Sequence, residues 1–349
     1  MSDPGRPLLD SAVFVVWGPP LKGRRSLVLG TDLGMDEVAY LADTWQPGMT
    51  SDPLKYPRLL WRTVRLLARR RPRVVFVQSP PTLAVWTVAL YAAMTGARFV
   101  VDAHSDAFQR TRWTRPRWLN RLVARRAVAT LVTDPHWARH LERSRAPVMV
   151  VPDIPQPAVD ASDDGIDVLG PGFHVMVVNT WSPDEPLADV VEAAAGLGEV
   201  TFHITGRRDG RVDALRPLPP NVRFTDFLAD DDYRRLMRSV HGVVCLTTRD
   251  HTMQRGACEA LSAGRPIITS RWPLLESYFS AGTVHVNNTS GEIRDGIVRL
   301  MTHYGEYADA ISALQRERRD EWFARRAALI KLVSTPAALA AAPSRGGSR

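Results

Sequence analysis

Short apolar runs alternate with amphipathic stretches along most of the chain. The runs are rich in Val and Ile and carry few polar positions, which is typical of strands buried on both faces of a parallel sheet. This rhythm predicts an α/β fold. The predicted strands are 12–17, 38–41, 73–79, 98–102, 129–133, 147–151, 173–179, 201–205, 222–225, 243–246 and 266–269.

The stretches between these runs repeat apolar residues at three- and four-residue spacing, as helices with one buried face do. Gly96 and Gly264 follow two of these stretches and are expected to end their helices. The predicted helices are 56–70, 82–94, 116–127, 136–143, 187–197, 230–240, a helix from about 250–252 to 264, 291–304 and 306–333.

The stretch Val243–Phe279 predicts a strand, a polar loop, a helix and a second strand, which is a βαβ crossover. The helix is expected to begin near Asp250–Thr252, with one of these residues as its N-cap. The polar loop then lies above free helix N–H groups, which suit a phosphate oxygen, and Glu259 faces the same crevice. The same spacing fits an ordinary crossover without a ligand equally well.

A length of 349 residues predicts two domains. Residues 152–171 are rich in Pro, Asp and Gly without periodicity, so they are interpreted as a linker. Residues 1–151 form the first predicted domain and residues 172–315 the second. Residues 316–333 extend the last helix, and residues 334–349 are predicted to be a disordered tail.

The two cysteines, Cys245 and Cys258, lie in apolar contexts and are expected to be buried thiols of a reducing compartment. Met1–Asp10 lacks the apolar core of a signal peptide, and no apolar run reaches the roughly 18 residues that a membrane span needs. A cytoplasmic location follows as the expectation, with attachment to the inner face of a membrane left open.

Positive charge is concentrated in the first half of the chain. The net charge is +8, yet residues 1–150 hold 23 Lys and Arg against 11 Asp and Glu. Arg110–Arg126 interleaves arginines with Trp113 and Trp118. This segment is expected either to rest on an anionic membrane surface or to pack its apolar face on the sheet, with solvated arginines. The high arginine content also fits nucleic-acid binding, although the arginines lie on an α/β framework typical of enzymes.

Two segments of the first half carry candidate site residues. Asp102, His104 and Asp106 follow the strand 98–102, and ligands of parallel sheets collect at the carboxyl ends of strands. A structural alternative is that one of these carboxylates caps the next helix. The glycine-containing basic loop after the first strand is either an anion cradle or a surface loop. Its candidate residues are Gly18, Lys22, Gly23 and Arg24.

Four segments together resemble glycosyltransferases of the GT-B type, near family 4. Glu259–Ile268 (EALSAGRPII) resembles the second half of that family's Glu-x7-Glu donor-site signature, and His251 stands where the first glutamate is expected. Phe76–Leu83, Phe99–Phe108 and Asn179–Leu187 are similar to segments of the β-mannosyltransferases that build the dolichol-linked core.

The resemblance implies two Rossmann-like domains facing a cleft, with the C-terminal helix 316–333 crossing back to the first domain. Residues 1–151 would bind the acceptor, and residues 172–315 would bind a nucleotide-diphosphate sugar. The acceptor is expected to be lipid-phosphate-linked or a saccharide. The reaction would be a hexosyl transfer without a cofactor or metal ion, and nucleic acid is not an expected partner.

The resemblance also implies roles for individual residues. Glu259 would accept hydrogen bonds from the ribose, and the helix N-terminus would meet the diphosphate. His104 would lie near the reaction centre, with Asp102 or Asp106 as a base if the enzyme inverts. The implied donor-binding residues are Glu259, His251, Thr252, Gln254, Arg255, Arg207 and Arg208.

One departure from the family pattern concerns Asn179–Pro186. Family members carry an Arg and a Lys at this place, whereas this chain has Asp184 and Glu185. The alternatives to an active transferase are therefore a catalytically impaired GT-B scaffold and a GT-B sugar-nucleotide epimerase. The acidic run Asp230–Asp232 is interpreted as the first turn of a helix rather than as a metal site.

Overall fold

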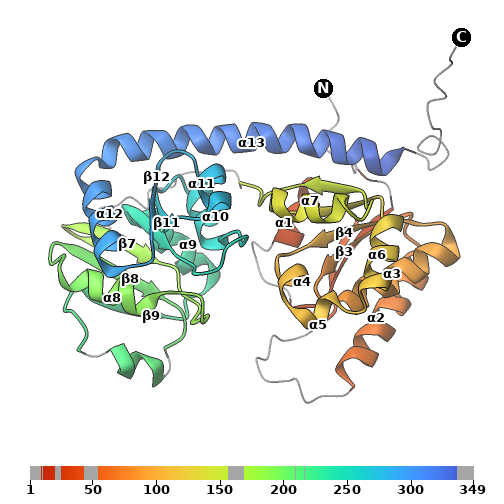
Figure 1. Ribbon diagram of the computed structural model, residues 1–349, viewed down its shortest axis with the longest axis horizontal. Helices are drawn as coiled ribbons and strands as arrows, with labels where there is room; N and C mark the ends of the chain where they lie inside the picture. The colour runs from red at the N-terminus through yellow and green to blue at the C-terminus, as the bar shows by residue number, and fades with distance from the viewer. Residues whose placement is uncertain are drawn as a thin grey trace, which may run out of the picture. The chain divides into compact units, whose positions relative to one another are not determined.

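The computed structural model describes residues 9, 11–19, 25–42, 54–155, 169–208, 210–215 and 217–335. The chain divides into two compact units (Figure 1). The described residues up to Pro152, together with those from Trp322 onward, form the first unit, and Asp153–Glu321 form the second. Each unit is a six-stranded parallel sheet of Rossmann type, as the apolar runs predict.

The sheet of the first unit has the strand order β2-β1-β3-β4-β5-β6. The order reverses at β1, so the loops that follow β1 and β3 leave the sheet toward opposite sides of a crevice. Its strands are β1 (Ala12–Val16), β2 (Glu37–Tyr40), β3 (Val74–Ser79), β4 (Arg98–Ala103), β5 (Ala129–Val132) and β6 (Val148–Val150).

Helices cover both faces of this sheet. The crossovers from β1 to β2 and from β2 to β3 run in opposite directions, and right-handed connections therefore place α1 and α2 on opposite faces. Gly96, at φ 75°, ends α3 as its sequence position predicts. The helices are α1 (Arg25–Asp32), α2 (Lys55–Arg70), α3 (Thr82–Thr95), α4 (Asp106–Gln109), α5 (Thr111–Thr114), α6 (Arg117–Arg126) and α7 (Pro135–Glu142).

The sheet of the second unit has the strand order β12-β11-β10-β7-β8-β9. Here the order reverses between β7 and β10, which places the switch point of the sheet between these two strands. Its strands are β7 (Phe173–Val177), β8 (Val200–Thr205), β9 (Val222–Asp226), β10 (Gly242–Cys245), β11 (Ile267–Ser270) and β12 (Thr283–Val286).

The last helix of the chain contributes residues to both units. Its residues from Trp322 onward belong to the first unit, where the Trp322 indole N–H donates to Asp32 at 2.7 Å. The prediction that the C-terminal helix returns to the first domain is confirmed. The helices of the second unit are α8 (Leu187–Ala195), a short 3-10 helix (Gly210–Leu215), α9 (Asp230–Ser239), α10 (Arg255–Ser262), α11 (Pro273–Tyr278), α12 (Ser290–Thr302) and α13 (Tyr304–Ser334).

Some predictions fall outside the described residues, and others need correction. Most of the predicted linker (156–168) and of the predicted tail (336–349) lies outside them, as do Lys22, Gly23 and Arg24. The helix expected from Asp250–Thr252 begins later, at Arg255. Within the described part of the chain, no helix combines the length and the apolar character that crossing a bilayer requires.

Candidate functional site

Two loops meet at the switch point of the second unit. Residues 178–186 follow β7, and residues 246–254 follow β10. The Thr247 hydroxyl donates to the Asp184 carboxylate at 2.7 Å, and the Thr248 N–H donates to the Asp184 carbonyl at 2.8 Å. Both loops lie at the carboxyl edge of the sheet, where open α/β sheets bind their ligands.

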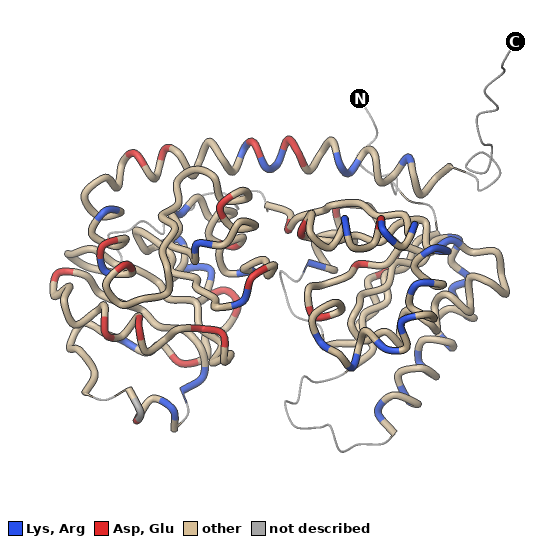
Figure 2. The backbone as a smooth tube through the Cα atoms, viewed as in Figure 1, with Lys and Arg blue, Asp and Glu red and all other residues tan. Residues whose placement is uncertain are grey.

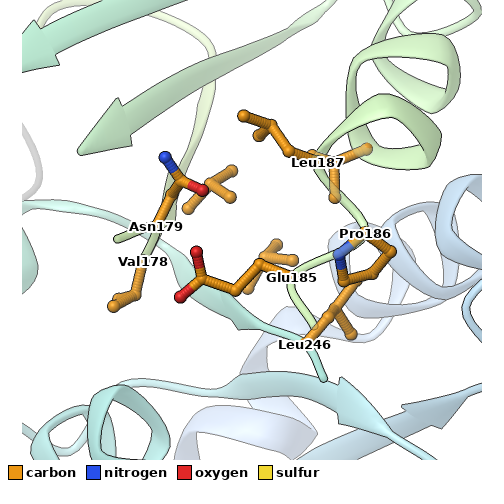
Figure 3. Close-up of a pocket in the computed structure, with 9 residues that line it drawn as sticks. Val178, Asn179, Glu185, Pro186, Leu187 and Leu246 are labelled. Atoms are coloured by element: carbon orange, nitrogen blue, oxygen red, sulfur yellow. The ribbon is translucent and has the colours of Figure 1, made fainter. Parts of the chain in front are cut away.

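Glu185 stabilises the loop after β7, to which it belongs. Glu185 accepts hydrogen bonds from the Thr180 N–H at 2.8 Å, the Thr180 hydroxyl at 2.7 Å and the Ser182 N–H at 2.9 Å. Burial raises the pKa of Glu185 above its ordinary value, despite these hydrogen bonds. In Figure 3 the Glu185 side chain lines a small pocket together with Asn179 and Leu246. Glu185 therefore shapes this loop.

Asp184 connects the two loops. Besides Thr247, its carboxylate accepts a hydrogen bond from the Ser182 hydroxyl. Burial raises the pKa of Asp184, but the hydrogen bonds from Ser182 and Thr247 and the charge of Arg249 outweigh that effect and lower it. Asp184 is therefore a carboxylate at neutral pH, and Arg249 is the nearby cation.

Glu259 lies in α10 with both carboxylate oxygens engaged. Arg255 Nε donates to Oε1 at 2.7 Å, and the Tyr233 hydroxyl donates to Oε2 at 2.9 Å. Burial raises the pKa of Tyr233 well above its ordinary value, so this hydroxyl keeps its proton and remains a donor. The Glu259 side chain is still 30% exposed. It is a fixed carboxylate that a ligand can reach.

The segment before α10 turns sharply, which explains the late start of this helix. His251 has a left-handed backbone, at φ 55°, and its N–H donates to the Asp250 carboxylate at 2.6 Å. The Thr252 hydroxyl donates back to the Asp250 carbonyl at 3.2 Å. These local hydrogen bonds compete with helix formation, so Gln254 becomes the N-cap residue. Four predicted donor residues nevertheless lie in this loop and first turn: His251, Thr252, Gln254 and Arg255.

The N-terminus of α10 packs tightly on the switch point. A Cβ on Gly256 would lie 2.7 Å from Val178 Cγ1 and 2.9 Å from the Cys245 sulfur, so only glycine fits there. Burial raises the pKa of Cys245 to about 12, and its thiol is therefore neutral and unreactive at neutral pH. The close approach leaves the first N–H groups of α10 next to the two loops.

The arginines predicted after β8 follow Gly206, which packs closely on Asn179 in the loop after β7. Arg208 forms an exposed ion pair with Asp226, with Nη2 2.8 Å from the carboxylate. Arg207 is exposed. Their role at the donor phosphate stays a prediction.

Sequence reasoning missed an aromatic stack beside the loop after β7. Trp181 lies parallel to Phe224 with ring centroids 6.2 Å apart, and the Arg211 guanidinium lies 5.0 Å above its ring. Arg211 also donates to the Trp181 carbonyl at 2.7 Å. Trp181 has a left-handed backbone, at φ 60°, so the stack holds a strained turn in place. The aromatic residues alone gave no signal of this pairing, since they lie far apart in sequence.

In the first unit, Asp102 lies at the end of β4 between two partners. Arg25 Nε donates to Oδ1 at 2.9 Å, and His104 Nε2 lies 3.4 Å from Oδ2. Arg25 also donates to the carbonyls of Val151 and Pro152. Burial raises the pKa of Asp102, but the charges of Arg25 and His104 and their hydrogen bonds lower it to about 2.

This geometry changes the role expected for Asp102. A carboxylate with so low a pKa is a poor proton acceptor at neutral pH, so Asp102 is suited to orient His104 rather than to act as the base. Asp106 instead lies in the first turn of α4 and pairs with Arg110 at 2.8 Å. Gly18 is buried after β1. Arg25 was not predicted as a site residue, because its partner lies 77 positions away.

No group of three His, Cys, Asp or Glu side chains in the described part of the chain is placed to hold a metal ion. The acidic run Asp230–Asp232 lies in the first turn of α9, where carboxylates complement the helix dipole. Asp231 and Asp232 also pair with Arg234 and Arg235 one turn later.

Two family models match the chain. Residues 13–153 match the glycosyl transferase 4-like domain, and residues 186–331 match a model described as glycosyl transferase-like. A search of curated proteins gave no significant match.

Solved structures share the fold over almost the whole chain. HepE of Anabaena, solved with UDP and glucose, is 16% identical, with a TM-score of 0.72 over 93% of this chain and 100% of that one. Sucrose-phosphate synthase from Thermosynechococcus elongatus is 16% identical, with a TM-score of 0.71 over 92% and 97%. A UDP-N-acetylglucosamine 2-epimerase from Listeria monocytogenes is 13% identical, with a TM-score of 0.62 over 92% and 96%. At this identity the likeness establishes the GT-B fold.

Proposed function

We propose that this chain, which combines a glycosyl transferase 4-like domain with a glycosyl transferase-like domain in the GT-B fold, transfers a sugar from a nucleotide-diphosphate sugar to an acceptor. The observation that carries the proposal is Glu259. Its carboxylate is held by two donors in a defined orientation and remains partly exposed beside the switch point. A fixed, accessible carboxylate is the group that binds a pair of ribose hydroxyls well.

The donor diphosphate is proposed to bind at the start of α10. The first N–H groups of that helix lack partners within the helix, and its dipole favours an anion. Arg255 in the first turn and Arg249 in the preceding loop supply cations near this end. This arrangement would stabilise the departing diphosphate electrostatically, without a metal ion. HepE, which was solved with UDP and with UDP-glucose, supports the choice of a uridine nucleotide for the first tests.

Catalysis in the first unit is assigned to His104. His104 Nε2 lies 3.4 Å from Asp102 Oδ2, within ion-pair distance, and Asp102 is itself fixed by Arg25. A histidine fixed by a carboxylate is suited to move a proton at the acceptor hydroxyl. The acceptor is proposed to be lipid-phosphate-linked or a saccharide. The transferred group is proposed to be a hexosyl unit. The closer likeness to β-mannosyltransferases stays a prediction.

The proposed location is the cytoplasm, at the inner face of a membrane. The sequence analysis assigned the contact with anionic lipid to Arg110–Arg126. That segment includes α6, which ends in Arg125 and Arg126 and contains no acidic residue. A basic segment of this kind is attracted to anionic lipid headgroups.

Nucleotide binding tests the proposal directly. UDP and GDP should each be titrated into the protein, with thermal unfolding and calorimetry as readouts, because a ligand that binds only the folded state raises the melting temperature. Glu259→Gln keeps the size of the side chain but removes its charge, and it should lower the nucleotide affinity at least about ten-fold. Glu276→Gln, an exposed glutamate of α11, is the matched control and should change nothing. If neither nucleotide raises the melting temperature of the wild-type protein, the donor site is wrong.

Asp184 and Glu185 favour a second candidate function. These acids stand where family members carry cations, so the chain is alternatively a sugar-nucleotide epimerase or a scaffold that has lost catalysis. An epimerase would interconvert two nucleotide sugars without an acceptor, and a scaffold would release no nucleotide from any donor. A screen of nucleotide sugars that follows both nucleotide release and epimer formation separates the three functions.

A further inference from the structure

Helix α2 has a buried face that docks it on the first unit. Leu59, Thr63 and Leu67 recur at four-residue spacing and are buried. The Trp17 indole N–H donates to the Thr63 hydroxyl at 2.8 Å. This face accounts for the position of the helix, and a helix needs only one such face to pack.

A second face of α2 is apolar and exposed. Leu60, Trp61 and Val64 follow one another at helical spacing and are 45%, 57% and 50% exposed. Pro57 and Ala68 extend the same stripe by a turn in each direction and are also exposed. Single exposed apolar residues are common on protein surfaces, whereas a continuous stripe of them marks an interaction site.

A third face of α2 carries only cations. Arg58, Arg65 and Arg69 are exposed and lie one residue further round the helix than Pro57, Val64 and Ala68, which is a rotation of about 100°. The Arg65 guanidinium lies 5.0 Å above the Trp61 ring, so the cationic and apolar faces adjoin. The helix contains no acidic residue, and Figure 2 shows basic positions along its length without an acidic one.

The neighbouring helices continue this surface. α3 lies beside α2, and α6 lies beside α3 (Figure 1). α3 exposes Leu90 and Met94, the latter at 77%, and α6 exposes Trp118 and Leu122. Neither α3 nor α6 contains an acidic residue. Exposed apolar residues therefore occur on three adjoining helices, none of which contains an acid.

We propose that this surface, named the α2 face after Leu60, Trp61, Val64, Arg58, Arg65 and Arg69, docks on an anionic lipid bilayer. A helix at the membrane interface buries an apolar stripe at the boundary between headgroups and acyl chains, and its cations meet anionic headgroups. Trp is favoured at this boundary because its ring is amphipathic. The α2 face provides both elements on one helix.

Other partners fit the surface less well. Two copies of this chain that met through their α2 faces would bring the arginine rows together, and like charges oppose that contact. A nucleic acid would use the arginines but would leave Leu60, Val64 and Met94 without a partner, since its backbone contacts are polar. The combination of cations and aliphatic side chains favours lipid.

The α2 face also revises where the membrane contact lies. The sequence analysis assigned it to Arg110–Arg126, yet in α6 the Arg125 guanidinium donates to the Ser144 carbonyl at 2.7 Å. The apolar stripe and the cations of the proposed contact both lie on α2. The inference goes beyond the proposed glycosyl transfer and does not depend on it, since lipid binding is measured without any sugar nucleotide.

Vesicle flotation tests the α2 face on the full chain. One vesicle preparation contains phosphatidylcholine alone, and the other contains equal parts of phosphatidylcholine and phosphatidylglycerol. We expect the protein to float with the anionic vesicles and to stay behind with the neutral ones. A double-stranded oligonucleotide added as a competitor should not displace it. Failure to float with anionic vesicles, or displacement by the oligonucleotide, overturns the inference.

Two sets of substitutions measure separately what the apolar stripe and the arginines of α2 contribute to vesicle binding. The variant L60Q/W61Q/V64Q removes the apolar stripe and should weaken vesicle binding at least about ten-fold. The variant R58Q/R65Q/R69Q should weaken it on the order of a hundred-fold, at about five-fold for each cation near the lipid surface. All six side chains are exposed, and the thermal unfolding of each variant, measured beside that of the wild type, shows that it is folded.

A matched control replaces exposed apolar residues elsewhere. Val298, Phe323 and Leu332 are exposed on α12 and α13, outside the α2 face. V298Q/F323Q/L332Q should bind anionic vesicles as the wild type does. Equal loss in this control and in L60Q/W61Q/V64Q, or unchanged binding of the latter, would show that the α2 face does not hold the protein on lipid.

Discussion

Each candidate site contains a carboxylate paired with an arginine, and the two pairs differ mainly in burial. In the first unit Arg25 binds Asp102 at 2.9 Å, and the Asp102 side chain is 1% exposed. In the second unit Arg255 binds Glu259 at 2.7 Å, and the Glu259 side chain is 30% exposed. The distances are similar, but only Glu259 is open to a ligand.

This difference separates a positioning group from a binding group. The buried Asp102 cannot be left unpaired, since an isolated charge in the interior is costly. It is therefore suited to hold Arg25 and His104 in place. Water can replace the partners of Glu259, so Glu259 can exchange a protein donor for a ribose hydroxyl at little cost.

Removal of the arginine from the buried pair should have the largest effect. Arg25→Met leaves the Asp102 carboxylate buried beside His104 with no guanidinium, and it also frees the carbonyls of Val151 and Pro152. The free energy of unfolding should fall by about 3–5 kcal/mol, the usual cost of breaking a buried ion pair from one side. Urea unfolding of the full chain measures it.

The double variant Arg25→Met with Asp102→Leu controls for lost packing. It removes both charges, so it should recover most of the lost stability, as replacement of a buried pair by apolar residues often does. A double variant that is no more stable than Arg25→Met alone would mean that the charge of Asp102 is not what makes the pair necessary.

A fall in pH should lower the free energy of unfolding through Asp102, by less than the Arg25→Met substitution does. The pKa of Asp102 falls from 3.8 to about 2 in the folded chain, so the unfolded chain takes up this proton first as the pH falls. The stability that Asp102 contributes is therefore fully present above pH 3.8 and is lost as the pH falls toward about 2. The loss amounts to about 2 kcal/mol. Asp102→Asn should show a flatter decline of unfolding free energy over this range, and an identical slope would contradict the shift.

The sequence predicted most of the sheet strands because buried parallel strands are continuous apolar runs. It missed β12, whose Thr283–Val286 run alternates apolar with polar residues at the edge of its sheet, and it missed the short helices α1 and α11. Edge strands and short helices depend on neighbours for their stability, and local periodicity does not record those neighbours.

The candidate site was predictable only where the motif is local. Glu259 and the loop before it were found because they lie within one crossover. The partners that define their chemistry were not found, because Tyr233 reaches Glu259 from another helix, and Arg25 reaches Asp102 from the start of α1, 77 positions away. Burial, which distinguishes the two carboxylates, is a property of the folded chain.

Removal of the tyrosine hydroxyl should sharpen the role of Glu259. Tyr233→Phe keeps the ring and deletes the donor to Glu259 Oε2. The carboxylate then loses one of its two fixed contacts, so nucleotide affinity should fall by about five-fold, or about 1 kcal/mol. Calorimetric titration with UDP measures it. Tyr307→Phe is the control on a tyrosine outside the loops, and an unchanged affinity in Tyr233→Phe would remove Tyr233 from the site.

Arg255→Gln should have the smallest effect on stability. The pair with Glu259 spans one helical turn and is partly exposed, and pairs of this kind contribute about 0.3–0.5 kcal/mol. The arginine also lies in the first turn of α10, where the helix dipole opposes a cation, so the net change in unfolding free energy should be below about 0.5 kcal/mol.

Binding should change more than folding, because Arg255 is proposed to meet the diphosphate. UDP affinity should fall while the affinity for uridine, which lacks the phosphates, stays the same. Equal losses for both ligands would mean that Arg255 acts only through the position of Glu259. A stability loss as large as that of Arg25→Met would mean that the two pairs do not differ in the way their burial predicts.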